Sequence, residues 1–101
     1  MEKQCCYKAF FETEENTVYH LEYSLLIQSV EQRKYYGVAV RMTNETGASE
    51  EDAVMGLCEN REKAEQFLLR LKENLALPIE LTALCDDFIS EWEMIENQMV
   101  S

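Results

Sequence analysis

The sequence is poor in the residues that build loops around ligands. It has three glycines, one proline and one histidine among 101 residues. It contains no P-loop, no dinucleotide-binding fingerprint and no Gly-x-Ser-x-Gly motif. So few glycines also argue against a backbone loop that cradles phosphate. These absences point away from the common nucleotide-binding and hydrolase classes, and we expect no cofactor.

Basic residues are also scarce. Nine lysines and arginines stand against twenty acidic residues, giving a net charge of −11. Nucleic acids and anionic membrane surfaces both require a basic footprint, so neither is an expected partner. The acidity is compatible with a basic protein partner, with divalent cations, or with solubility alone.

Long apolar runs and an export signal are missing as well. No apolar run approaches the length of a membrane span. The first residues, MEKQCC, lack the basic-then-apolar pattern of a secretory signal. A chain of this length suits one domain, so we expect a single cytoplasmic domain over residues 1–101.

The four cysteines, Cys5, Cys6, Cys58 and Cys85, contain no CxxC pair and resemble no zinc module. Without an export signal we expect free thiols, with Cys58 and Cys85 as small core residues. For His20 to activate Cys5 or Cys6 as a nucleophile, its ring would have to lie within hydrogen-bonding distance of the thiol. A metal site of His20, Cys58 and Cys85 would need three elements to converge. We therefore predict a surface histidine and no metal.

Alternation of apolar and polar residues predicts an antiparallel sheet of three or four strands. The strongest case is 18–30, where apolar residues on one face alternate with polar residues on the other. The charged break Glu31–Lys34 predicts a hairpin connection. Thr43–Asp52 reads as a solvated loop. We expect strands at about residues 5–13, 18–30, 35–43 and 53–58.

The second half of the chain changes to a helical period. Asn60 is a good N-cap for a helix at about 61–75, and Pro78 ends that pattern. A second amphipathic helix is expected at about 80–97. Strands followed by helices predict an α+β fold, a meander sheet with both helices on one face.

The second helix has two faces of different chemistry. Its outer arc carries the acidic residues Asp86, Asp87 and Glu91, which we interpret as a solvated face, with a shared cation as the alternative. Aromatic residues and methionine are enriched at interface cores. The expected contact residues are therefore Trp92, Met94 and Met99 on this helix, with Leu69 on the first.

Four segments carry a family resemblance. They are Tyr36-Gly37-Val38-Ala39-Val40, Cys58-Glu59-Asn60-Arg61-Glu62-Lys63, Leu77-Pro78-Ile79-Glu80-Leu81 and Asp86-Asp87-Phe88. Their order resembles a family of short Firmicutes proteins catalogued as a domain of unknown function, over roughly residues 18–90. Asn60 replaces the family's usual aspartate and keeps the capping role, whereas Glu80 replaces a frequent histidine. The resemblance implies a small intracellular bacterial protein and adds no catalytic residue.

These features favour a non-catalytic protein–protein interaction module, with a protein partner or a second copy of itself in a homodimer. One alternative is an acidic decoy that occupies a basic, nucleic-acid-binding surface. The other is a small-ligand binder or enzyme that uses the sheet face near His20.

Overall fold

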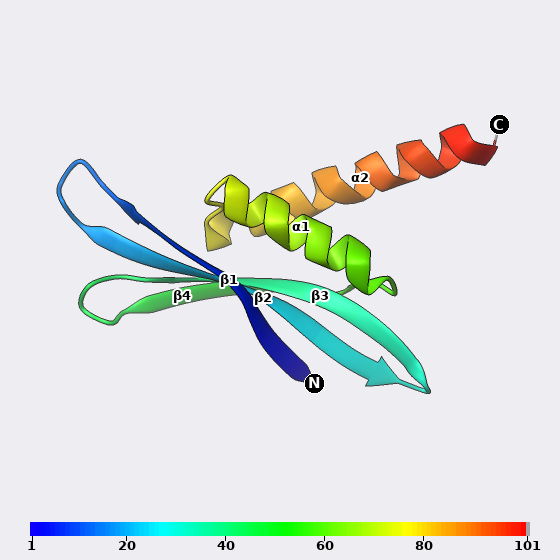
Figure 1. The fold of residues 1–101 in the computed structure, drawn as a ribbon, viewed down its shortest axis with the longest axis horizontal. Helices are drawn as coiled ribbons and strands as arrows, with labels where there is room; N and C mark the ends of the chain where they lie inside the picture. Colours follow the sequence, from blue (N-terminus) through cyan, green and yellow to red (C-terminus); the bar gives the residue numbers. More distant parts are fainter. Residues whose placement is uncertain (101) are drawn as a thin grey trace.

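The computed structural model describes the backbone of residues 1–100 and the side chains of residues 1–91. It is an antiparallel meander sheet in the order β1-β2-β3-β4, followed by two helices (Figure 1). This confirms the predicted α+β class and strand neighbours. The elements are β1 (Glu2–Glu12), β2 (Val18–Val30), β3 (Arg33–Thr43), β4 (Ser49–Cys58), α1 (Arg61–Glu73), η1 (Pro78–Glu80) and α2 (Leu81–Val100).

The core lies between one face of the sheet, called here the helix face, and the two helices. The alternating residues of β2 and β3 supply the sheet side of this core, as predicted from their period. The helices supply apolar stripes from α1 and from the first half of α2. The largest fully buried side chains are Leu21, Tyr23, Leu25, Val38, Val40, Phe67, Leu68, Leu71 and Leu81.

The strands are longer than predicted at three of their ends. β3 begins at Arg33 because Glu31 and Gln32 form a two-residue turn, with φ of 49° and 69°. The predicted loop to Asp52 is wrong, since β4 already begins at Ser49. The Asn44 side chain explains this, because its Oδ1 accepts hydrogen bonds from the backbone N–H groups of Thr46 and Ala48. These bonds close the turn within a few residues, and the strand follows directly.

The first helix begins as predicted and ends early. The Asn60 side chain accepts a hydrogen bond from the Lys63 N–H, which confirms its capping role. At the other end Ala76 N–H donates to Leu71 O and Leu75 N–H donates to Lys72 O, the pattern of a Schellman motif. Leu75 occupies the left-handed position of this motif, with φ of 49°. Leu75 is therefore 41% exposed and lies outside the apolar stripe of α1. The predicted helix to residue 75, which placed Leu75 in that stripe, is wrong at this end.

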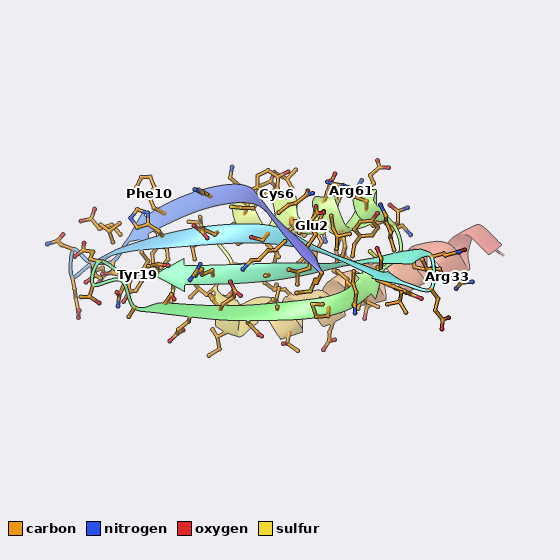
Figure 2. All side chains as sticks on the ribbon, turned by 90° about the horizontal axis from the view of Figure 1, so that it is seen from below. Glu2, Cys6, Phe10, Tyr19, Arg33 and Arg61 are labelled. Atoms are coloured by element: carbon orange, nitrogen blue, oxygen red, sulfur yellow. The ribbon has the colours of Figure 1, made fainter. Side chains whose placement is uncertain are left out.

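The face of the sheet away from the helices, called here the outer face, is buried at its centre. Ser24 is 3% and Ala39 2% exposed, although no helix covers them. The sheet is twisted so strongly that Lys3 on β1 reaches Glu51 on β4, with 2.6 Å between Nζ and Oε2. Figure 2 shows the first residues of β1 crossing over the neighbouring strands on this face. The face that the alternation of residues 18–30 predicted to be polar is therefore not solvated at its centre.

Gly37 lies where β4 presses onto β3. Tyr36 pairs with Cys58 and Val38 with Val54, so three residues of β4 bulge opposite Gly37 alone. A Cβ atom at Gly37 would lie 2.2 Å from the backbone oxygen of Val54. No larger residue fits this position unless the β4 backbone moves.

The Tyr23 hydroxyl ties the sheet to the segment between the helices. It donates a hydrogen bond of 3.0 Å to the carbonyl oxygen of Ala76, and both residues are fully buried. Burial, together with the nearby charge of Glu80, raises the pKa of Tyr23 to about 12. The bond also occupies the carbonyl of Ala76, the residue that completes the C-terminal motif of α1.

We predict that Gly37→Ala destabilises the fold by at least about 2 kcal/mol, because the added methyl group meets backbone and not a flexible side chain. In a domain of this size that corresponds to a melting temperature about 10 °C lower. Thermal unfolding followed by circular dichroism measures it. An unchanged melting temperature would mean that the β4 bulge is free to move.

We predict that stability falls as the pH rises from 10 to 12, in part through Tyr23. The folded state keeps the Tyr23 proton to about pH 12, whereas an unfolded tyrosine loses it near pH 10. The contribution is fully present below pH 10, and about 2–3 kcal/mol of it is lost as the pH rises through 12. Urea unfolding across this range measures it. Tyr23→Phe is the control: it should cost about 1 kcal/mol at neutral pH and flatten the alkaline slope.

Candidate functional site

The junction of α1 and α2 fixes the direction in which α2 runs. The rings of Phe67 and Phe88 stack with their centroids 4.6 Å apart. The Arg70 guanidinium lies 5.0 Å from the centre of the Phe88 ring, and its Nη1 donates to Glu91 Oε2 at 2.6 Å. One arginine of α1 therefore contacts α2 through a cation–π interaction and an ion pair, one turn apart.

A hollow of about 190 Å³ lies beside this junction. It is below the volume of pockets that enclose drug-sized ligands. Its lining combines apolar side chains with the charged side chains of Arg70, Asp87 and Glu91. Its lining residues are Phe67, Arg70, Leu71, Asn74, Leu84, Asp87, Phe88 and Glu91.

The predicted acidic face of α2 borders this junction. Asp86, Asp87 and Glu91 are all exposed, and Glu91 forms a surface ion pair with Arg70. The alternative of a cation shared by Asp87 and Glu91 stays a prediction. Among the described residues, no group of three His, Cys, Asp or Glu side chains is placed to hold a metal ion.

The structure does not bring His20 together with a cysteine thiol. His20 pairs with Phe10, whereas Cys5 pairs with Ser24, four residues farther along β2. That separation is about 13 Å along a strand, beyond the reach of a hydrogen bond. Cys6 is the extra residue of the β1 bulge, and burial raises the pKa of its thiol. A nucleophilic pair with either cysteine is therefore excluded in this geometry.

The two carboxyl-terminal cysteines lie in or beside the core. Cys85 is buried and Cys58 is half-buried, and Cys58 Sγ donates a hydrogen bond to the Asn60 carbonyl. Burial, with a smaller effect of Asp86, raises the pKa of Cys85 to about 11. A thiol with a raised pKa is a poor nucleophile at neutral pH, so these residues serve packing.

His20, on the outer face, does not line the hollow at the helix junction. A second hollow, of about 270 Å³, lies at the turn end of the sheet. Its lining residues are Tyr19, Met42, Asn44, Ala48, Ser49 and Glu50, and His20 is not among them. His20 is exposed beside Phe10, with ring centroids 6.4 Å apart.

The expected contact residues fall on two helices. Leu69 is 39% exposed on α1, away from the core stripe. The side chains of Trp92, Met94 and Met99 lie outside the described residues. The backbone of α2 is described to Val100, and its last turns extend past α1 and past the end of the sheet (Figures 1 and 2).

Sequence reasoning missed one exposed feature, the free edge of β1. Phe10 is 69% exposed there, between Lys8 and Glu12 on the same face. The signal was present as an alternation of charged and aromatic residues in the first strand.

Comparison with known proteins gives one match. Residues 2–91, from β1 to the middle of α2, match the Family of unknown function (DUF6514). No curated protein and no solved structure matches the chain. None of the described helices is both long enough and apolar enough to cross a membrane. The match spans most of the chain, and the protein belongs to this family of unknown function.

Proposed function

We propose that this protein acts through protein–protein contact, without catalysis, and that the second half of α2 is the contact element. The observation that carries the proposal is the course of α2, which continues beyond α1 and the sheet (Figure 1). A helix that leaves its own domain gains no folding energy from an apolar stripe in that part. An apolar stripe there is instead suited to a partner.

The helical period of the sequence supports this assignment. Phe88 packs against Phe67 in the core. Continuing from Phe88 at helical spacing, the same stripe reaches Trp92 and Met99. Met94 falls on the opposite arc, among acidic residues, where an apolar side chain has no role in folding. Both arcs of this part of α2 therefore carry residue types that are common in interfaces.

The charge of this part of the chain favours a partner with basic residues around an apolar stripe. After Lys72 the sequence contains seven acidic residues and no lysine, arginine or histidine: Glu73, Glu80, Asp86, Asp87, Glu91, Glu93 and Glu96. Complementary charges speed association, and salt weakens their attraction. Salt does not weaken an apolar contact in this way. Salt dependence therefore separates an apolar contact from the alternative of an acidic decoy.

We predict that Trp92→Ala and Met94→Glu each weaken partner binding at least tenfold. Truncating a central interface residue commonly costs about 2 kcal/mol or more, and Met94→Glu places a charge in an apolar contact. The protein is tagged and recovered from the extract of its native cells at low and high salt, and the co-purifying chains are identified and titrated. The same variants are measured by light scattering to detect a second copy.

The matched control is Thr82→Ala, which replaces an exposed polar residue in the first turn of α2, outside the proposed contact element. It should bind as the parent does. Equal recovery and equal mass for the parent and both interface variants would contradict the proposal. A basic partner that is lost entirely at high salt would favour the acidic decoy.

A further inference from the structure

The free edge of β1 differs from the free edge of β4. Both strands lie at the ends of the order β1-β2-β3-β4. β4 carries Glu50, Glu51 and Asp52 in succession and a bulge at Gly56, which are devices that prevent edge pairing. On β1 the only irregularity is at Cys6, and the ladder with β2 is regular from Tyr7 to Glu12. This regular stretch of edge is available to another strand.

The side chains of this stretch are arranged symmetrically about Phe10. On the outer face Lys8 precedes Phe10 by two residues and Glu12 follows it by two. Phe10 is 69% exposed, a large apolar side chain left in solvent. An antiparallel strand centred on Phe10 would therefore need a negative charge opposite Lys8 and a positive charge opposite Glu12. β1 itself has that pattern.

A row of alternating charge already crosses the outer face to this edge. Lys8 stands opposite Glu22, Glu22 opposite Arg41, and Arg41 opposite Glu51. The row ends at Lys8 because β1 is the last strand. A glutamate placed beside Lys8 from a new strand would continue the alternation, whereas a lysine there would be repelled.

We propose that two copies of this chain associate edge to edge through β1, antiparallel, with the two-fold axis at Phe10. Each Lys8 then faces Glu12 of the second copy, and the two Phe10 side chains face each other. The two sheets become one continuous sheet with all four helices on the same face. The inference deepens the proposed function by naming a second copy as one partner, but it uses a different surface from α2.

The helices leave room for this arrangement. In Figure 2 Phe10 lies at the free edge of β1, at the end of the strand away from Arg61, the first residue of α1. The two-fold axis carries the second α1 to the far side of Phe10, so the two helices do not meet. α2 of each copy also stays free at the opposite end of its domain (Figure 1).

A charge exchange tests the pairing and its register. Light scattering and sedimentation over a concentration series should show a concentration-dependent dimer for the parent. Lys8→Glu creates two Glu–Glu contacts across the axis and Glu12→Lys creates two Lys–Lys contacts. Each should weaken the dimer at least about tenfold. Mixing the two variants restores both opposite-charge contacts, and so does combining both substitutions in one chain.

A cross-link tests the same register independently, with Cys5 and Cys6 replaced by serine. Opposite residues of antiparallel strands have Cα atoms about 4.5–5.5 Å apart, which a disulfide spans. Phe10→Cys should therefore form a covalent dimer under mild oxidation. Lys8→Cys is the matched control, because the two copies of that position lie about 13 Å apart along the strands. Circular dichroism confirms that each variant is folded.

A parent that stays monomeric at every concentration would overturn the inference, and so would single variants that fail to recover on mixing. Loss of the dimer in Trp92→Ala but not in Lys8→Glu would place self-association on α2. That result would refute the β1 pairing and leave the proposed function standing. Loss of the dimer in Lys8→Glu, with partner recovery unchanged in the α2 variants, would support the β1 pairing and refute the proposed role of α2.

Discussion

The sheet is longer than the helices that cover it, and most other features of the structure follow from that mismatch. The strands have 10 to 13 residues, which corresponds to about 33–43 Å. α1 has 13 residues, which corresponds to about 20 Å. One helix of this length covers half of such a sheet. The turn end of the sheet and the second half of α2 are therefore left without a neighbouring layer in the described part of the chain (Figure 1).

Twist compensates for part of the missing cover. A strongly twisted sheet brings two diagonal corners together on one face, and here those corners carry Lys3 and Glu51. The exposed ion pair itself contributes little to stability. The approach is possible because the residues beneath it are small, with Gly37, Ser24 and Ala39 in the central strands. Ser24 and Ala39 are buried on a face that no helix covers, so the centre of this face is closed without a second layer of helices.

The sequence predicted the parts of this fold that depend on local periodicity. β2 alternates without interruption on its helix face, and its predicted bounds are those observed. The Asn60 cap was also predictable, because capping needs only a side chain and the next three residues. The start of β4 was not, because three consecutive acids are unusual in a strand and are tolerated only at an edge. Edge position is a property of the whole sheet. The ion pair of Glu91 with Arg70 could not be predicted either, because it joins two helices. Hydrophobic periodicity shows the apolar face of each helix but not how the two helices are placed relative to each other.

The two exposed features of this domain lie at opposite ends and have different chemistry. The edge of β1 offers backbone hydrogen bonds and a self-complementary charge pattern, which suit a second copy. On the proposed function, the second half of α2 offers an apolar stripe in a segment whose charged residues are all acidic, a pattern that would favour a basic partner. Pairing through β1 would leave α2 free, and the axis at Phe10 would place the two α2 helices at the two ends of one long sheet. A dimer of this kind would hold two partner-binding helices at a fixed separation. That would raise its apparent affinity for a partner with repeated sites above that of the single helix.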